Sequence, residues 1–479
     1  MRDVCGRAIE AALQAGAEYA DARGVVRRDQ HVSTKNGQVE SVADSESEGL
    51  GVRVLVGGAW GFACDRRLSE DGAAEAARRA VDFARASAER TRRPVELAAR
   101  PAEQGEWRTQ AERDPIEVPL EEKIELLLRA EGAAKHPDVK IVEAYARAMH
   151  EERAFRSSDG ADLLQEFVEC GAGLDAYAQS DGRLQIRSHP SAHGGSSAQA
   201  GWEYVESLGL EREAPRVAEE AAALLRADPC PATTTTVVID SEQMELQVHE
   251  SVGHPTELDR IYGTEAAYAG TSFVGAGDLG SLRYGSEHMN ITADPSTPLG
   301  LGTYAWDDEG VPGQRAAIVR GGVLEGFLTS RETAAMLGEG RGGSMRADGW
   351  SRMPLVRMTN LHLEPGEGSL DDLLADVDDG IYLQTNKSWS IDDKRLNFQF
   401  GTQIAWEIKK GRLGRMLRDA TYMGVTPEFW GSLDAVAGPE EWRMHGLTNC
   451  GKGQPGQSAH VSHGASPARF RNVRVGVRS

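Results

Sequence analysis

Residues 233–255 read TTTTVVIDSEQMELQVHESVGHP, and the second half of the chain is best understood outward from this segment. Its first seven residues, Thr233–Ile239, form a β-branched run that is typical of a buried strand. A helical segment follows and ends in the pattern His-Glu-x-x-x-His, formed by His249, Glu250 and His254. We therefore expect a strand followed directly by a helix that carries two imidazoles and a carboxylate.

The spacing of the two histidines departs from the familiar His-Glu-x-x-His arrangement. On an ideal helix, residues four apart differ in direction by about 40°, whereas residues five apart differ by about 140°. A straight helix would therefore place the two rings on different faces. Gly253 can adopt a positive φ, and Pro255 disfavours the αR region for the residue before it. We expect His249 and Glu250 in the last helical turn, with His254 folding back from just beyond the helix end.

These residue types are typical of zinc hydrolases. Two imidazoles hold the metal, and the glutamate beside the first acts as a general base on a metal-bound water molecule. A catalytic zinc site commonly has three protein ligands and one open position. The alternative interpretation of the pattern is a helix with two surface histidines.

Cys450 is the preferred third ligand. It lies in residues 448–457, TNCGKGQPGQ, where Gly451 and Gly453 permit close approach and Lys452 would favour the thiolate. A lone cysteine is also compatible with simple packing in a core. The other candidate ligands, of which the first is the strongest, are Glu257, Asp259, His445 and His463.

The 479 residues suggest two or three domains. Helical periodicity is found in residues 4–13, 69–90, 119–134 and 214–227, and residues 93–115 resemble a surface connection. Strand pairs are predicted to turn at residues 35–37, 57–58, 159–160, 181–182, 321–322 and 410–411. Residues 228–232, DPCPA, interrupt the pattern. We predict an α+β fold with two domains, residues 1–230 with helices and antiparallel strands and residues 231–479 with mostly β structure, in which the active-site helix follows the first strand after the boundary.

Composition excludes several classes of protein. Hydrophobic residues make up 40% of the chain, the formal net charge is −21, and no apolar run is long enough to cross a membrane. An acidic chain repels nucleic acid, although the charge could also draw basic peptides into a cavity. The N-terminus lacks the apolar segment of a secretory signal. Five scattered cysteines without a CxxC motif fit a reducing compartment. We expect a cytoplasmic protein without nucleic-acid or membrane partners.

Two further sequence features are not expected to form a catalytic or cofactor-binding site. Residues 275–280, GAGDLG, match the dinucleotide-binding G-x-G-x-x-G motif, but the sequence after them is strand-like where a helix is required, so we expect a glycine turn. Four tryptophans are expected to be core or interface aromatics: Trp202, Trp306, Trp350 and Trp430.

Several segments together resemble the TldD/PmbA family of metalloproteases. They are HESVGHPTELDR at 249–260, CGKGQPGQ at 450–457, VSHGASPARFRNVRVG at 461–476 and, more loosely, GLGVRVLVGGAWGF at 49–62. The HExxxH motif resembles the TldD-type subunit, because the non-catalytic PmbA/TldE-type subunits lack it. The resemblance implies zinc bound by His249, His254 and Cys450, with Glu250 as the general base.

The resemblance also implies a dimer that encloses a cavity, formed with the help of residues 1–230. The dimer would be a homodimer or a heterodimer with a PmbA/TldE-type subunit. Unfolded or modified peptides would lie in it as an added β-strand, a binding mode that ignores side-chain identity. The expected function is that of a zinc-dependent peptidase. The alternatives are a non-catalytic or scaffolding subunit with a structural metal, and a metal-dependent amidase that acts on a small molecule.

Overall fold

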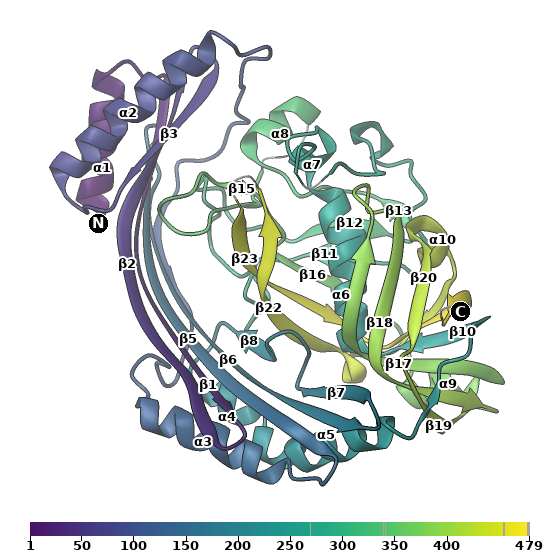
Figure 1. Cartoon of the computed structure of the whole chain (residues 1–479). Helices are drawn as coiled ribbons and strands as arrows, with labels where there is room; N and C mark the ends of the chain where they lie inside the picture. The colour runs from purple at the N-terminus through teal and green to yellow at the C-terminus, as the bar shows by residue number, and fades with distance from the viewer. Residues whose placement is uncertain (269, 339, 341, 454–455, 477–479) are drawn as a thin grey trace.

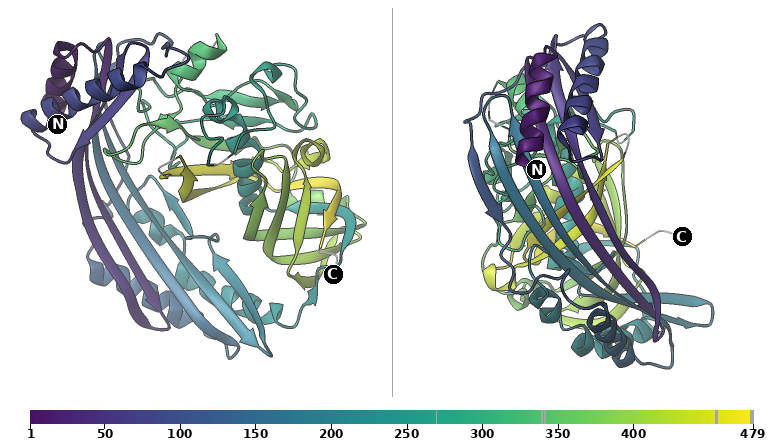
Figure 2. Two further views of the ribbon diagram at one scale, coloured as in Figure 1. Left: turned by 45° about the horizontal axis from the view of Figure 1, so that its top comes forward. Right: turned by 90° about the vertical axis from the view of Figure 1, so that its left-hand side faces the viewer.

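The computed structural model describes residues 1–268, 270–338, 340, 342–453 and 456–476. It shows an α+β protein, as predicted, in which a long curved sheet faces a strand-rich C-terminal half (Figure 1). Figure 2 shows the curvature of this sheet from two further sides. No helix in the described part of the chain is long and apolar enough to cross a membrane.

The long sheet is built from the N-terminal half of the chain. Its strands are β1 (Tyr19–Lys35), β2 (Gln38–Val56), β3 (Ala59–Asp65), β4 (Gln104–Arg108), β5 (Val139–Ser157), β6 (Asp162–Ser180), β7 (Arg183–His189) and β8 (Ser196–Ala198). They follow the order β3-β2-β1-β5-β6-β4, and β7 and β8 also pair with β6. The turns predicted at 35–37 and 57–58 join β1 to β2 and β2 to β3 in antiparallel register. The predicted turns at 159–160 and 181–182 likewise join β5, β6 and β7.

Two groups of helices cover the outer face of this sheet, away from the C-terminal half (Figure 1). These helices are α1 (Arg2–Gln14), α2 (Glu70–Ala88), α3 (Leu120–Ala133), α4 (Glu203–Ser207) and α5 (Leu210–Leu224). The contact is close, because a Cβ atom on Gly61 of β3 would lie 2.0 Å from the carbonyl oxygen of Ala80 in α2. Strand β4 corrects the expectation for residues 93–115. Its sequence QGEWR lacks an apolar face, yet it pairs in parallel with β6.

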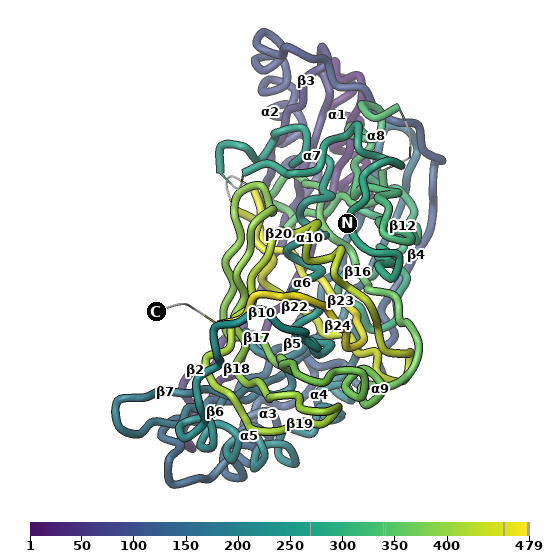
Figure 3. Tube along the Cα trace, turned by 90° about the vertical axis from the view of Figure 1, so that its right-hand side faces the viewer, coloured from purple at the N-terminus to yellow at the C-terminus, as the bar shows by residue number. Residues whose placement is uncertain are grey.

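The C-terminal half contains two main sheets. The first consists of β9 (Asp228–Pro229), β10 (Thr233–Ile239), β17 (Asp379–Ile391), β18 (Asn397–Lys409), β19 (Arg412–Arg418), β20 (Thr421–Val425), β21 (Leu433–Val436) and β24 (Ala468–Val475). Because β17 also pairs with β18, the strands β17-β10-β24-β20-β18 close into a barrel (Figure 3). The second sheet has the order β13-β12-β11-β16-β23-β22. Its strands are β11 (Ile291–Ala293), β12 (Ala316–Arg320), β13 (Val323–Leu324), β16 (Asn360–Leu363), β22 (Arg443–Lys452) and β23 (Gln457–Ala465).

Helix α6 (Ser241–Val248) follows β10 and lies between the barrel and the β22–β23 hairpin (Figure 1). Its side chains Met244 and Val248 belong to the large core of this half. The remaining short elements are α7 (Leu258–Ile261), α8 (Arg331–Leu337), α9 (Leu370–Ala375), α10 (Thr426–Gly431), β14 (Met345–Arg346) and β15 (Leu355–Val356). Residues 275–280 form a short 3₁₀ turn and no helix of a dinucleotide site, as expected.

The four tryptophans occupy core or interface positions, as expected. Trp202 and Trp430 are fully buried. Trp306 and Trp350 lie so close to the long sheet that Cβ atoms on Gly105 and Gly49 would be 2.6 Å and 2.5 Å from their rings.

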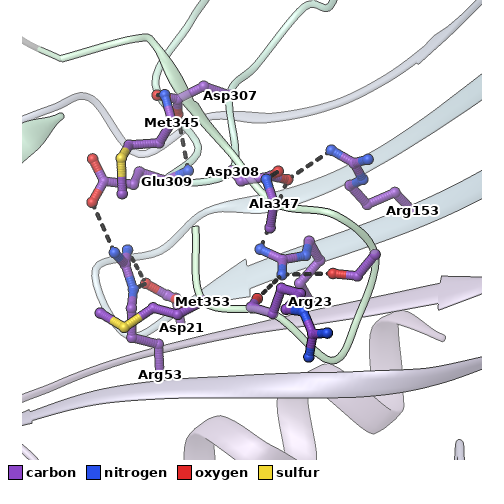
Figure 4. A network of polar contacts seen from close by, with 12 residues as sticks. Asp21, Arg23, Arg53, Arg153, Asp307, Asp308, Glu309, Met345, Ala347 and Met353 are labelled. Atoms are coloured by element: carbon purple, nitrogen blue, oxygen red, sulfur yellow. Dashed lines mark hydrogen bonds and ion pairs between the residues drawn. The ribbon is translucent and has the colours of Figure 1, made fainter. Parts of the chain in front are cut away.

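A buried ionic network joins the two halves (Figure 4). The turn at residues 307–309 projects carboxylates toward arginines of the long sheet. Asp308 Oδ1 lies 2.8 Å from Nη1 of Arg153, and Glu309 Oε1 lies 3.0 Å from Nη1 of Arg53. Burial raises the pKa of Asp308, but the neighbouring arginines outweigh it and hold this pKa below its ordinary value.

Removal of the Asp308 carboxylate should therefore destabilise the protein. In Asp308→Ala the Arg153 guanidinium stays buried and, of its two carboxylate partners, keeps Glu151. Breaking a buried ion pair costs about 3–5 kcal/mol in the free energy of unfolding. We expect a lower midpoint of thermal unfolding by calorimetry. Asp82→Ala, which removes an exposed carboxylate 3.7 Å from Arg85, is the control and should keep the wild-type midpoint. Equal midpoints for both variants would contradict this role.

Candidate metal centre

Helix α6 does not end at the His-Glu-x-x-x-His pattern. Asp240 caps its first turn by accepting a hydrogen bond from Gln243 N at 2.9 Å. At the other end, residues His249–Gly253 form a π-helical turn, in which His254 N–H donates to the carbonyl oxygen five residues earlier. The wider turn places the rings of His249 and His254 on the same side, with centroids 4.9 Å apart.

This turn corrects the expected route of the chain. His254 has φ −60° and ψ −40°, and Gly253 has φ −57°, so neither residue leaves the right-handed helical region. The expectation rested on the conformational preferences of Gly253 and Pro255. In the structure the helix itself widens at this turn, and the wider turn brings the two rings together. Gly253 serves packing instead, because a Cβ atom there would lie 2.2 Å from Sδ of Met358.

Three side chains converge beyond this turn. Ligand atoms of His249, His254 and Cys450 all lie within 4.8 Å of one another, and Cys450 Sγ is 3.8 Å from His254 Nε2. All three residues are buried. Two ligands of a tetrahedral zinc ion are about 3.3–3.8 Å apart, as the bond lengths of about 2.0–2.3 Å require. The donor set therefore fits a soft-to-borderline divalent metal such as zinc.

The hydrogen bonds of His249 fix which of its nitrogens faces this centre. His463 Nδ1 lies 3.2 Å from the carbonyl oxygen of Leu361 and donates to it. His463 Nε2 therefore accepts, and its partner at 2.7 Å is Nδ1 of His249. This assignment, made from the hydrogen-bond network, leaves Nε2 of His249 with a free lone pair. His463, one of the candidate ligands, thus orients the ring of His249.

His254 is oriented by a carboxylate. Its Nδ1 lies 3.0 Å from Oε2 of Glu257, so Nε2 again carries the lone pair. Lys452 neutralises this carboxylate from 3.3 Å and contacts Asp259 Oδ1 at 2.8 Å. Glu257 and Asp259, both considered as third ligands, are therefore engaged around the centre. All of these charged groups are buried.

The remaining candidate, His445, lies in a separate ion pair. Its Nδ1 is 2.9 Å from Oε1 of Glu245. Burial lowers the pKa of His445, but the carboxylate outweighs burial and raises this pKa to about 9. A protonated imidazole has no lone pair for a metal.

The positive charge that acts on Cys450 comes from Arg357. Burial raises the pKa of this thiol, yet the guanidinium of Arg357 and the His254 ring together lower it below its ordinary value. Arg357 also donates to the carbonyl oxygen of Cys450. From the sequence, this effect is assigned to Lys452, and that assignment is wrong. The Lys452 ammonium is held by Asp259 and Glu257.

Glu250 follows His249 in the π-helical turn, is itself buried, and its charge acts on the His249 ring. Its carboxylate contacts Nη1 of Arg395, which comes from the tip of the β17–β18 hairpin. Burial lowers the pKa of both His249 and His254, and the charge of Arg395 lowers both further. Both imidazoles are thus favoured in the neutral form that binds metals.

Sequence reasoning missed the two arginines of this site. Arg357 and Arg395 lie outside every recognised motif, in the segments RMPLVRM and DDKRLNF, and no spacing rule connects either with residues 249–254. Their roles depend on how distant strands pack. Such contacts leave no local signal in one sequence.

Comparisons with known proteins identify the family of the chain. Family models of the PmbA/TldA metallopeptidases match at residues 20–86 (domain 1), 113–227 (central domain) and 232–477 (C-terminal domain). A metalloprotease of Methanothermobacter thermautotrophicus is 31% identical over 459 residues, 96% of this chain and 95% of that one. A metalloprotease of Methanocaldococcus jannaschii is 29% identical over 461 residues, 96% of this chain and 97% of that one. A zinc metalloprotease TldD homologue of Saccharolobus solfataricus is 26% identical over 242 residues, 50% of this chain and 51% of that one.

Solved structures share the fold along the whole chain. A protein of Thermotoga maritima described as a putative modulator of DNA gyrase has a TM-score of 0.77 at 20% identity, with 99% of each chain covered. TldE from Thermococcus kodakarensis has a TM-score of 0.75 at 16% identity, covering 99% of this chain and 100% of that one. The domain matches and the full-length relatives together show that the chain belongs to the PmbA/TldA metallopeptidase family and is a metallopeptidase of the TldD/PmbA type.

Proposed function

We propose that this metallopeptidase uses zinc, held by His249, His254 and Cys450, to hydrolyse unfolded or modified peptides. The observation that carries the proposal is the convergence of ligand atoms from the three side chains within 4.8 Å of one another, with the buried Glu250 next to His249 in the sequence. The Saccharolobus solfataricus relative, a zinc metalloprotease TldD homologue by name, supports the choice of zinc. The nitrogen and sulfur donor set supports it independently.

Glu250 is the general base in this proposal. Bound zinc would polarise the scissile carbonyl and make a water molecule more acidic. Glu250 takes a proton from that water as the oxygen attacks the carbonyl carbon, and it then delivers the proton to the leaving amine. His463 and Glu257 keep the two imidazoles in the tautomers that leave Nε2 free. The buried surroundings exclude bulk water from these charges.

A structural metal is the main competing function. It would need four protein ligands. Among the described residues, the group that could hold a metal consists of three side chains only. The nearby His463 and Glu257 are engaged with the ligands' other nitrogens. This arrangement favours an open coordination position and hence catalysis.

We propose that the peptide lies along the Cys450 end of β22, because Gly446 of this strand lies directly against β8. This strand is the outermost one of its sheet and carries Cys450. A peptide added to it as a strand would run past the metal ligands, with main-chain hydrogen bonds providing most of the affinity. We further propose that two subunits enclose the site, as a homodimer or with a TldE-type partner, because the TldE chain shares the fold along its whole length. We also propose a cytoplasmic location, which the five free cysteines fit. The proposed domain division at residue 230 is supported by the gap between the family-model matches that end at 227 and begin at 232.

The variant Glu250→Gln tests the mechanism. It keeps the size of the side chain but removes the base, so we expect a fall in kcat of about 10²–10⁴-fold on an unstructured peptide with metal content unchanged. The measurements are steady-state kinetics and elemental analysis, with and without a TldE-type partner. Glu428→Gln, an exposed residue of α10, is the control and should keep full activity. Full activity of Glu250→Gln would refute the mechanism.

The variant Cys450→Ala tests the ligand set. With only two imidazoles left, we expect the purified protein to contain almost no zinc and to cleave neither peptides nor acylated small molecules. Elemental analysis measures the loss. Full zinc occupancy in Cys450→Ala would remove this residue from the ligand set. Cleavage of acylated metabolites but not of peptides by the wild type would instead favour the amidase.

The variant His463→Leu tests the orientation of His249. Without an acceptor at Nδ1, His249 loses its fixed tautomer, and we expect zinc affinity to fall by about 10–100-fold in competition with a chelator. His463→Gln keeps an acceptor group and should recover part of this loss. Unchanged affinity in His463→Leu would show that the contact with His249 is dispensable.

A further inference from the structure

Arg395 is a cation placed directly at the candidate reaction centre. It lies at the tip of the hairpin between β17 and β18, and its Nη1 atom contacts Oε2 of Glu250. The side chains of the two residues are 16% and 8% exposed. Its contact with Glu250 places this largely buried guanidinium next to the proposed general base.

The backbone of Arg395 supports a role for its side chain. Its φ of +61° lies in the left-handed region, which a residue with a Cβ atom adopts only at a cost. The turn is held firmly around it. Arg395 N donates to the carbonyl oxygen of Asp392 at 2.8 Å, and Thr426 Oγ1 donates to the carbonyl oxygen of Arg395 at 2.8 Å. Glycine would satisfy the same turn more easily. The turn therefore does not explain the arginine, whereas the contact with Glu250 does.

Two other cations near the centre are engaged elsewhere. Arg357 donates to the carbonyl oxygens of Gln457 and Cys450 and so fixes the ends of the β22–β23 hairpin. Lys452 is held by Asp259 and by the carbonyl oxygen of Val356. Arg395 differs from both, because it contacts the carboxylate of Glu250. Its Nε atom, like that of Arg357, is buried and has no hydrogen-bond partner among the residues that the structure describes. It therefore keeps donor capacity that a ligand can use.

We propose that Arg395 is a catalytic residue that stabilises the oxyanion of peptide hydrolysis. The inference rests on the proposed function of Glu250. A water molecule that Glu250 deprotonates lies within hydrogen-bond reach of its carboxylate, so the attacked carbonyl lies next to the guanidinium that contacts the same carboxylate. Donors aimed at developing negative charge in a site that excludes water stabilise the transition state strongly.

The step balances without a further reactant. As Glu250 takes one proton, the water oxygen forms a bond to the carbonyl carbon and the π electrons of the C=O bond move to its oxygen. The guanidinium of Arg395 donates a hydrogen bond to this oxygen. The electron pair then returns, the C–N bond breaks, and the proton held by Glu250 passes to the leaving amine.

The variant Arg395→Met tests the inference in the full-length protein loaded with zinc. We expect kcat on an unstructured peptide to fall by about 10²–10³-fold, with KM within about threefold of the wild type and zinc content unchanged. The affinity of a phosphinic peptide, whose anionic oxygens mimic the oxyanion, should fall by a similar factor in calorimetry. Affinity for the cleavage product should stay the same. Arg395→Lys keeps the positive charge but lacks the planar guanidinium. Its kcat and its phosphinic-peptide affinity should therefore lie between those of Arg395→Met and the wild type.

Lys394→Met is the matched control. It removes a positive charge from the exposed neighbour on the same turn and should leave kcat and phosphinic-peptide affinity at the wild-type level. Arg395→Met with wild-type kcat and phosphinic-peptide affinity, next to an inactive Glu250→Gln, would overturn the role of Arg395 and leave the peptidase proposal standing. A fully active Glu250→Gln would instead overturn the peptidase proposal. If Arg395→Met does not fold, Arg395→Lys decides, because wild-type kinetics in that variant would also overturn the inference.

Discussion

Two imidazoles five residues apart can reach one ion only where the backbone between them makes a wider turn than an α-helix does. In this protein the π-helical turn at His249–Gly253 provides that turn. The turn is held from several directions, since Trp430 Nε1 donates to Ser251 Oγ at 2.9 Å and Tyr284 donates to the Ser251 carbonyl oxygen at 2.5 Å. The side-chain packing of the C-terminal core therefore fixes the geometry of the candidate metal centre.

The polar groups around this turn form a chain of hydrogen bonds and ion pairs, in which each group fixes the tautomer or the orientation of the next. The Leu361 carbonyl sets the tautomer of His463, and His463 sets that of His249. On the other side, Lys452 holds Glu257, which orients His254. A buried lysine or glutamate alone would be costly, but the paired charges compensate one another and need not move when a metal binds. Such preorganisation keeps the ligand atoms in place.

Local patterns predict much of this architecture, and tertiary packing determines the rest. Thr233–Ile239 is predicted as a strand with the observed bounds, because a β-branched run after a proline-rich break is typical of a strand. The predicted route of His254 is wrong. The conformational preferences of Gly253 and Pro255 are outweighed by tertiary packing, in which Gly253 lies against Met358. The short polar strand β4 and the arginines at 357 and 395 were missed, because each depends on a distant partner that carries no local signal.

The long N-terminal sheet supplies none of the three converging side chains, yet it helps to position one of them. Glu169 of β6 lies 2.6 Å from Nδ1 of His460 on β23. Burial raises the pKa of this glutamate, but His460 together with Arg147 and Arg27 lowers it below its ordinary value. On β22, a Cβ atom on Gly446 would lie 1.9 Å from the carbonyl oxygen of Ser197, so this strand lies directly against β8. The β22–β23 hairpin is thus held between α6 and the long sheet (Figure 1). Cys450 lies on that hairpin almost two hundred residues after His254. Its thiol can meet the two imidazoles because both halves of the chain fix the strand that carries it.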